Sequence, residues 1–201
     1  REEYIQILDQ KSMRLKALIE DMFEVSKANS GSIALNLVEV DVVSLMKQVR
    51  LELDDRMRTS GIDFRFQLPD RKIKLLLDSQ KTYRVFENLL INIVKYGMPG
   101  TRAYIEITEW EEEGQEKPGE VRVAMKNISA AELSDDGRDL TDRFVRGDQS
   151  RNTEGSGLGL AIARSFVELQ GGRFELETEA DLFKVTLMWK KSGEREETAF
   201  S

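Results

Sequence analysis

The chain of 201 residues contains no cysteine and no histidine. Without cysteine it can form no disulfide framework and has no thiolate nucleophile. The lack of both residue types also excludes zinc and most transition-metal sites, which are built from thiolate and imidazole ligands. A metal ion bound here would therefore be a hard cation held by oxygen ligands, and Mg²⁺ is the first candidate.

The sequence also lacks long apolar runs and an excess of positive charge. No run of about 18 apolar residues occurs, so we expect no membrane contact by these residues, and no secretory signal opens the chain. The net charge of −7 argues against non-specific nucleic-acid binding, which needs Lys and Arg to neutralise phosphates. The chain begins inside a helical pattern without a methionine, and we therefore expect a fragment of a longer protein.

The first 28 residues predict one long helix. Its apolar residues are three and four positions apart, as in a heptad pattern: Tyr4, Leu8, Leu15, Leu18, Met22 and Val25. Such a helix either lies on the following domain or forms part of a dimeric bundle. The sustained pattern before the breaker Ser30-Gly31-Ser32 favours the bundle.

Beyond this breaker the pattern is that of an α/β domain. Strands are predicted over residues 33–40, 62–68, 73–77, 103–110, 121–127, 173–178 and 183–189, and helices over 42–59, 79–96 and 158–170. Asp41 is expected to cap the first of these helices, and Asp78 or Ser79 the second. Residues 129–154 show little periodicity and favour a lid, whereas residues 111–119 predict a hairpin loop and residues 191–201 a disordered tail.

The helix predicted over residues 79–96 carries two stripes, one apolar and one polar. Asn88, Asn92, Lys95 and Tyr96 form the polar stripe, which borders the apolar one. A carboxamide offers an oxygen to a hard cation and an N–H group to a phosphate oxygen. The two asparagines can also be plain polar neighbours of the core. Asparagine is a poor helix former, however, so a pair at this spacing followed by Lys-Tyr favours a binding role.

A glycine-rich turn, Gly155-Ser156-Gly157-Leu158-Gly159, opens the last predicted helix. Glycines allow close backbone approach, and a helix start offers N–H groups to phosphate. Alone, such a turn can equally be an ordinary helix start, and it matches neither a P-loop nor a Rossmann fingerprint. In the preceding stretch, Arg146 and Arg151 could reach phosphates and Phe144 could anchor a lid, although an exposed basic loop would look the same.

Taken together and in order, these residues resemble the catalytic, ATP-binding domain of bacterial sensor histidine kinases. The resemblance covers about residues 1–190: Asn88 to Tyr96 is similar to the N box, Phe144 with Arg146 to the F box, and Gly155 to Leu160 to the G2 box. It implies a two-layer α/β sandwich, a mixed sheet with helices on one face (the Bergerat fold), after a long N-terminal helix. Residues 1–30 would be the second dimerisation helix and residues 31–190 the catalytic domain.

The resemblance also implies a role for each candidate residue. Asn92 would bind Mg²⁺ with support from Asn88, and Lys95 and Arg146 would contact the phosphates of ATP. Tyr96 would flank the nucleotide, and the remaining cofactor contacts would come from Phe144, Arg151, Gly155, Ser156, Gly157, Leu158 and Gly159. The acceptor histidine would precede Arg1. The parent would be a homodimeric membrane sensor that holds this domain in the cytoplasm and passes the phosphoryl group to a response regulator.

The sequence departs from this family at one motif. The family's Asp-x-Gly-x-Gly is replaced by Asn127-Ile-Ser-Ala-Ala. The Asn127 carbonyl can still accept a hydrogen bond from the adenine amino group, although it carries no charge. Because both glycines are missing, a degenerate scaffold or pseudo-kinase module remains an alternative.

A second alternative is an ATP hydrolase of the same fold. Hydrolytic relatives such as gyrase place a glutamate one turn before the Asn92 position as the general base for water. Asn88 stands there in this chain, and an amide cannot accept that proton. The adjacent Glu87 is rotated by about 100° around the helix. The sequence therefore favours transfer to a histidine outside these residues.

Overall fold

A computed structural model of the chain describes residues 34–110, 119–131, 133 and 158–191. It also describes isolated helical positions in the N-terminal segment: Tyr4, Ser12, Lys16, Ile19, Glu20, Phe23, Ser26 and Lys27. Among the described residues, no helix is long and apolar enough to cross a bilayer.

The elements follow the predicted α/β order along the chain. They are β1 (Leu37–Asp41), α2 (Val42–Glu52), α3 (Asp54–Thr59), β2 (Asp63–Gln67), β3 (Lys74–Asp78), α4 (Ser79–Tyr96), β4 (Arg102–Trp110), β5 (Glu120–Ile128), α6 (Gly159–Leu169), β6 (Arg173–Glu179) and β7 (Leu182–Lys190).

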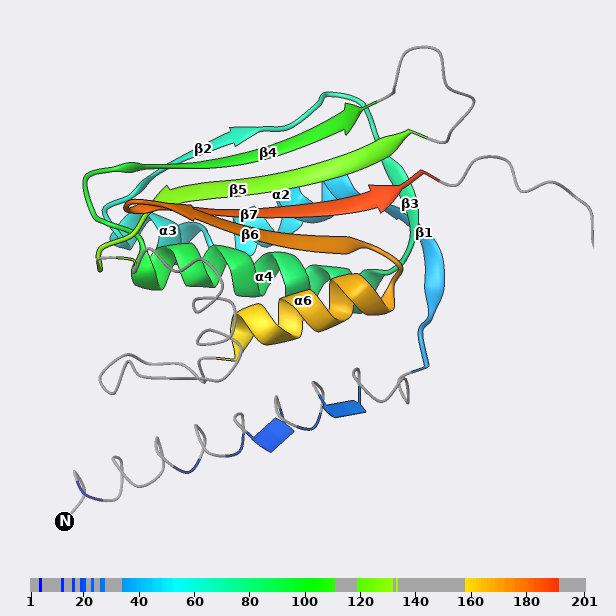
Figure 1. The fold of residues 1–201 in the computed structure, drawn as a ribbon, viewed down its shortest axis with the longest axis horizontal. Coiled ribbons are helices and arrows are strands. Elements are labelled where there is room, and N and C mark those ends of the chain that lie inside the picture. The colour runs from blue at the N-terminus through cyan, green and yellow to red at the C-terminus, as the bar shows by residue number, and fades with distance from the viewer. Residues whose placement is uncertain are drawn as a thin grey trace, which may run out of the picture.

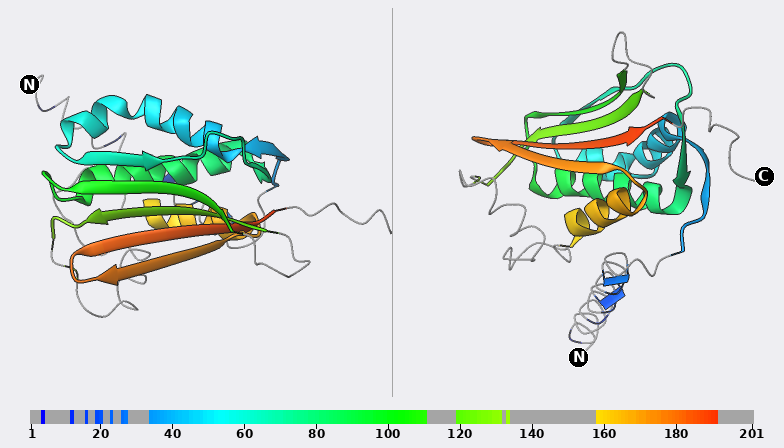
Figure 2. Two further views of the ribbon diagram at one scale, coloured as in Figure 1. Left: turned by 90° about the horizontal axis from the view of Figure 1, so that it is seen from above. Right: turned by 45° about the vertical axis from the view of Figure 1, so that its right-hand side comes forward.

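The main sheet has five strands in the order β2-β4-β5-β7-β6. Strand β2 runs parallel to β4, and the other neighbours are antiparallel. Helices α2, α4 and α6 cover one face of this sheet, while β1 and β3 form a separate antiparallel pair (Figures 1 and 2). The predicted two-layer sandwich with a mixed sheet is therefore confirmed.

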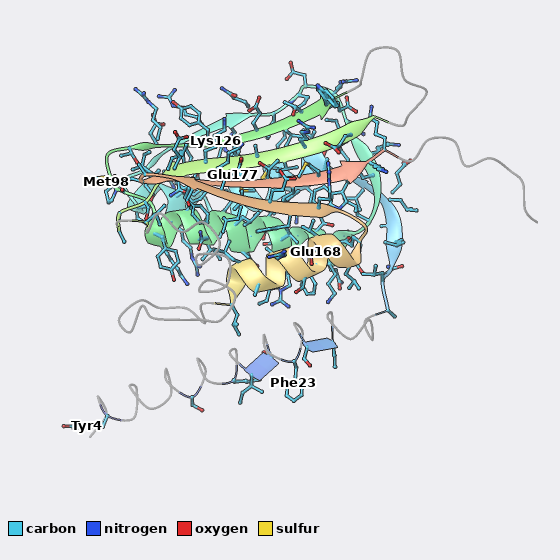
Figure 3. The ribbon with its side chains drawn as sticks, in the orientation of Figure 1. Tyr4, Phe23, Met98, Lys126, Glu168 and Glu177 are labelled. Carbon is cyan, nitrogen blue, oxygen red and sulfur yellow. The ribbon has the colours of Figure 1, made fainter. Side chains whose placement is uncertain are left out.

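The core lies between the sheet and the helices. Every second residue is buried from Ala103 to Ile107 in β4 and from Val121 to Asn127 in β5, and α4 presents the predicted apolar stripe to them. The opposite face of the sheet carries charged residues such as Lys126 on β5 and Glu177 on β6 (Figure 3). This one-sided burial is why β4 and β5 alternate in sequence, whereas β7 is buried continuously over residues 185–189.

The prediction of a single helix over residues 42–59 is wrong. Helix α2 ends at Glu52, Leu53 forms a turn with φ −98° and ψ 5°, and α3 starts at Asp54. The buried Leu53 side chain anchors this turn in the core. Asp54 and Asp55 then occupy the first turn of α3, where carboxylates stabilise a helix start.

Other boundaries shift by a few residues, and the strand predicted from residue 33 begins at Leu37. The caps are as expected: Asp41 caps α2, and Asp78 rather than Ser79 caps α4. The predicted hairpin loop, the lid and the tail lie almost wholly outside the described residues, and so do Phe144, Arg146, Arg151, Gly155, Ser156 and Gly157.

Candidate functional site

The polar stripe of α4 meets the start of α6. The two helices lie side by side (Figure 1), and Asn88 contacts Gly159. A β-carbon built on Gly159 would lie 3.4 Å from Asn88 Oδ1, an ordinary van der Waals distance, so the two residues pack directly against each other. The sequence predicted that the asparagines of α4 lie close to the glycine turn that opens α6. This proximity is observed for Asn88 and Gly159.

The start of α6 is suited to an anion. Leu158 precedes the helix and makes no side-chain capping bond to it. The first N–H groups of a helix have no intrahelical acceptor and carry a partial positive charge. Beside them, the Asn88 Nδ2 atom is buried and has no hydrogen-bond partner among the described residues. The Asn88 side chain thus lies against the start of α6 with its Oδ1 atom nearest to Gly159, and its Nδ2 atom is left as an unpaired buried donor.

The other polar-stripe residues continue toward the C-terminal end of α4. Asn92 and Tyr96 are half-buried, whereas Lys95 is exposed. The Tyr96 carbonyl accepts a hydrogen bond from Ala130 N at 2.8 Å, and Met98 N donates to the Ile128 carbonyl at 2.8 Å. These bonds fix the end of α4 against the end of β5.

Asn127 lies at this same joint. It is only 4% exposed, and its Nδ2 donates to the Ile128 carbonyl at 3.1 Å. Its Oδ1 atom is buried and, within the described part of the chain, accepts no hydrogen bond. A β-carbon built on Gly97, the residue that ends α4, would lie 3.5 Å from Asn127 Nδ2. Asn127 therefore has a buried acceptor atom that no described group engages.

The two missing motif glycines are explained by the local backbone. Ser129 N donates to the Asp181 carbonyl at 2.8 Å, and Ser129 forms a bridge with Gly97. Among the described residues, the non-glycine with positive φ is Ala180, so neither Ser129 nor Ala131 adopts that conformation. The chain leaves β5 in a path that residues with side chains can follow.

The acidic residue next to Asn88 lies on a different side of α4. The Tyr83 hydroxyl donates to Glu52 at the end of α2. This hydrogen bond, together with partial burial and the charges of Glu87 and Glu52, raises the pKa of Tyr83 to about 12. Glu87 therefore lies near Tyr83, while Asn88 faces α6.

Across the part of the chain that the structure describes, no three acidic side chains gather to hold a metal ion. A cation at this site would depend on carboxamide oxygens and on its ligand's own phosphates. A groove on the open face of the sheet includes Asn127 but is otherwise separate from the site. Its walls carry Asp63 and Glu106 as well as Arg102 and Lys126, so no single charge prevails there.

Sequence reasoning missed Gly97, Thr82 and Gln170. Gly97 follows the predicted binding motif directly, but its role depends on Ile62 and Asn127, which are distant in sequence. Thr82 and Gln170 contact each other across 88 positions, and a single sequence carries no signal for such a pair.

Comparison with known proteins identifies the class. The family model of the histidine kinase-, DNA gyrase B-, and HSP90-like ATPases matches residues 77–195, more than half of the chain. The chain therefore belongs to this family.

Within it, the similarities are to sensor kinases. The sensor protein VanSC of Enterococcus gallinarum is 27% identical over 191 residues, which cover 93% of this chain and 50% of VanSC. The full-length ShkA structure in complex with AMPPNP has a TM-score of 0.70 at 22% identity, over 94% of this chain and 38% of that chain. The structure of the kinase ThkA in complex with the response regulator TrrA has a TM-score of 0.66 at 21% identity, over 96% and 52%.

The chain is thus the ATP-binding domain of a bacterial sensor histidine kinase, as the motifs predicted. It spans half or less of the length of the first curated relatives that it matches.

Proposed function

We propose that this domain binds Mg-ATP between α4, the end of β5 and the start of α6, and donates the γ-phosphoryl group to a histidine outside these residues. The observation that carries the proposal is a pair of buried polar atoms without partners in the described residues. Asn88 Nδ2 is a donor beside the start of α6, and Asn127 Oδ1 is an acceptor beside the end of α4. A phosphate oxygen and the adenine amino group complement them in that order.

Each remaining residue has a role in this arrangement. Asn92 would hold Mg²⁺ through its amide oxygen, with Asn88 in support, since hard cations prefer oxygen ligands. When bound, Mg²⁺ would neutralise the charge of the phosphates. Lys95 and Tyr96 would contact phosphate and nucleotide from the same stripe. Arg146, Phe144, Arg151 and the backbone of residues 155–159 complete the proposed site.

The alternatives have less support. A hydrolase needs a base for water next to the γ-phosphate. Glu87 lies toward Tyr83, and the residue that faces α6 is the amide Asn88. A scaffold without nucleotide would have no use for the buried unpaired acceptor of Asn127, whose desolvation costs about 1–3 kcal/mol.

At the level of the whole protein, we propose a homodimer formed through the N-terminal helix, a membrane-anchored parent and a response regulator as the final acceptor. Support for the dimer comes from exposed apolar side chains in that helix: Tyr4 is 75%, Ile19 46% and Phe23 62% exposed. Such residues favour burial against a partner helix.

Calorimetry with a non-hydrolysable ATP analogue, with and without Mg²⁺, tests the site. We expect Asn92→Ala to abolish the Mg²⁺-dependent part of the affinity. Asn36→Ala makes the same change at an exposed asparagine and should bind like the wild type. Undiminished Mg²⁺-dependent affinity in Asn92→Ala would remove this assignment.

Phosphoryl transfer is tested with labelled ATP and a histidine-bearing helical hairpin from the parent protein. The kinase proposal predicts label on the hairpin. Release of free phosphate without a labelled hairpin would instead identify a hydrolase.

A further inference from the structure

A hydrogen-bonded junction joins the far ends of α4 and α6, away from the nucleotide site. The Gln170 side chain, at the end of α6, accepts a hydrogen bond from Asp78 N at 2.7 Å. Its Oε1 also lies 3.2 Å from the Thr82 hydroxyl, which donates to the Asp78 carbonyl at 2.8 Å. Its Nε2 donates to the Phe166 carbonyl at 2.8 Å, in the last turn of α6. Every polar atom of the Gln170 amide is thus engaged.

This junction is buried and belongs to the start of α4. Asp78 is 6% exposed and Thr82 is fully buried. The Asp78 carboxylate caps α4 by accepting from Gln80 N and Lys81 N. Gln170 therefore bonds to α4 at its capped N-terminus.

The two contacts between α4 and α6 are separated by nearly the same distance along each helix. Gln170 lies 11 positions from Gly159, about 16 Å along a helix axis, and Asp78 lies 10 positions from Asn88, about 15 Å. The Gln170–Asp78 hydrogen bond and the Asn88–Gly159 contact therefore connect the two antiparallel helices at matching positions, one at each end of α6. The apolar contacts between the helices are non-directional, whereas hydrogen bonds require a defined position.

We propose that Gln170 is a positioning residue of the nucleotide site: through Asp78 and Thr82 it sets the axial register of α6 on α4, and so places the start of α6 beside Asn88. This inference rests on the proposed function. A shift of α6 along its axis would move the phosphate-binding N–H groups away from Asn88.

Adenine recognition should depend much less on this register. Asn127 is held by β5, and β5 is bonded to the end of α4 through Ala130 and Met98, without α6. Loss of the Gln170 hydrogen bonds should therefore weaken phosphate binding and leave adenine binding unchanged. A general loss of folded protein would weaken both equally.

The test compares the affinities of this chain for Mg-AMPPNP and for adenosine by calorimetry. Gln170→Met keeps the side-chain length and removes the hydrogen bonds. We expect it to bind Mg-AMPPNP about tenfold more weakly while its adenosine affinity changes by less than about twofold. Gln48→Met, the same change at an exposed position of α2, should alter neither affinity.

A second pair of variants tests the proposal if Gln170→Met does not fold. Thr82→Val is isosteric but has no hydroxyl, and it should weaken Mg-AMPPNP by about threefold, whereas Thr82→Ser should restore the affinity. Equal losses for both ligands, or no loss for either, would overturn the positioning role. If the wild type binds neither ligand, the proposed function itself fails.

Discussion

At the residue scale, Gly97 and Gly159 both lie beside an asparagine of the site, yet they should tolerate substitution differently. A β-carbon on Gly97 would lie 2.6 Å from the Ile93 carbonyl oxygen and 2.6 Å from Ile62 Cδ1. The carbonyl belongs to the helix backbone and cannot move freely. On Gly159 the nearest atom would be Asn88 Oδ1, at 3.4 Å.

We therefore predict that Gly97→Ala lowers the free energy of unfolding by about 1–3 kcal/mol, as overpacking does, while Gly159→Ala changes it by less than about 0.5 kcal/mol. Urea unfolding followed by circular dichroism measures both. A Gly97→Ala protein as stable as the wild type would show that the end of α4 is not packed as described.

The residues of the site differ in how well a sequence reveals them. Asn88 and Asn92 were proposed because helical periodicity puts them on one stripe, and Asn127 because it stands where the resembled family has the Asp of its Asp-x-Gly-x-Gly motif. The acceptor role of Asn127 Oδ1 could not be predicted, since it depends on Nδ2 being engaged by the Ile128 carbonyl. Gln170 is an ordinary polar residue in sequence, and its partner Asp78 is 92 positions away.

At the scale of elements, apolar periods of 2 and 3.6 residues in the sequence predicted which segments are strands and which are helices. They did not predict the break between α2 and α3. Leu53 continues the apolar spacing of α2, so periodicity alone predicts an unbroken helix through it. At the break, Leu53 leaves helical geometry while Leu53 and Met57 both stay buried, at 5% and 4% exposure, and Asp54 and Asp55 begin a new helix.

The start of α2 gives a pH-dependent prediction. Burial alone would raise the pKa of Asp41, but hydrogen bonds from the Ser44 hydroxyl and from the backbone N–H groups of Ile73, Ser44 and Val43 together lower it. Because the folded-state pKa is lower than that of the unfolded chain, the stabilisation is full above the unfolded pKa of about 4. It is lost as the pH falls through the folded-state pKa.

Asp41→Asn keeps a capping oxygen and removes the charge. We expect it to be less stable than the wild type at neutral pH, and we expect this difference to shrink as the pH falls below about 4. Urea unfolding at a series of pH values checks this, with Asp70→Asn as the same change at an exposed turn position. A difference that stays constant with pH would mean that the Asp41 charge does not stabilise the α2 start.

At the scale of the whole molecule, one continuous core connects the described parts of the proposed site. Buried residues of α2, α4, α6 and the main sheet form a single apolar cluster. Hydrogen bonds between neighbouring strands fix the sheet, and the proposed site lies where α4, β5 and α6 meet. Ligand binding at this meeting point should therefore stabilise the domain as a unit rather than one local segment.

A ligand that binds only the folded state at 100 times its dissociation constant adds about 2.7 kcal/mol to the free energy of unfolding. For a domain of this size that corresponds to a rise of roughly 5–10 °C in Tm.

We predict such a rise with Mg-AMPPNP and a smaller one with the guanosine analogue at the same concentration. Guanine places a carbonyl oxygen where adenine has its amino group, and two acceptors would then face each other at Asn127 Oδ1. Differential scanning calorimetry measures both shifts, and Asn127→Ala should make them equal. Equal shifts in the wild type would instead mean that Asn127 does not read the base, because a buried acceptor must favour the ligand that donates to it.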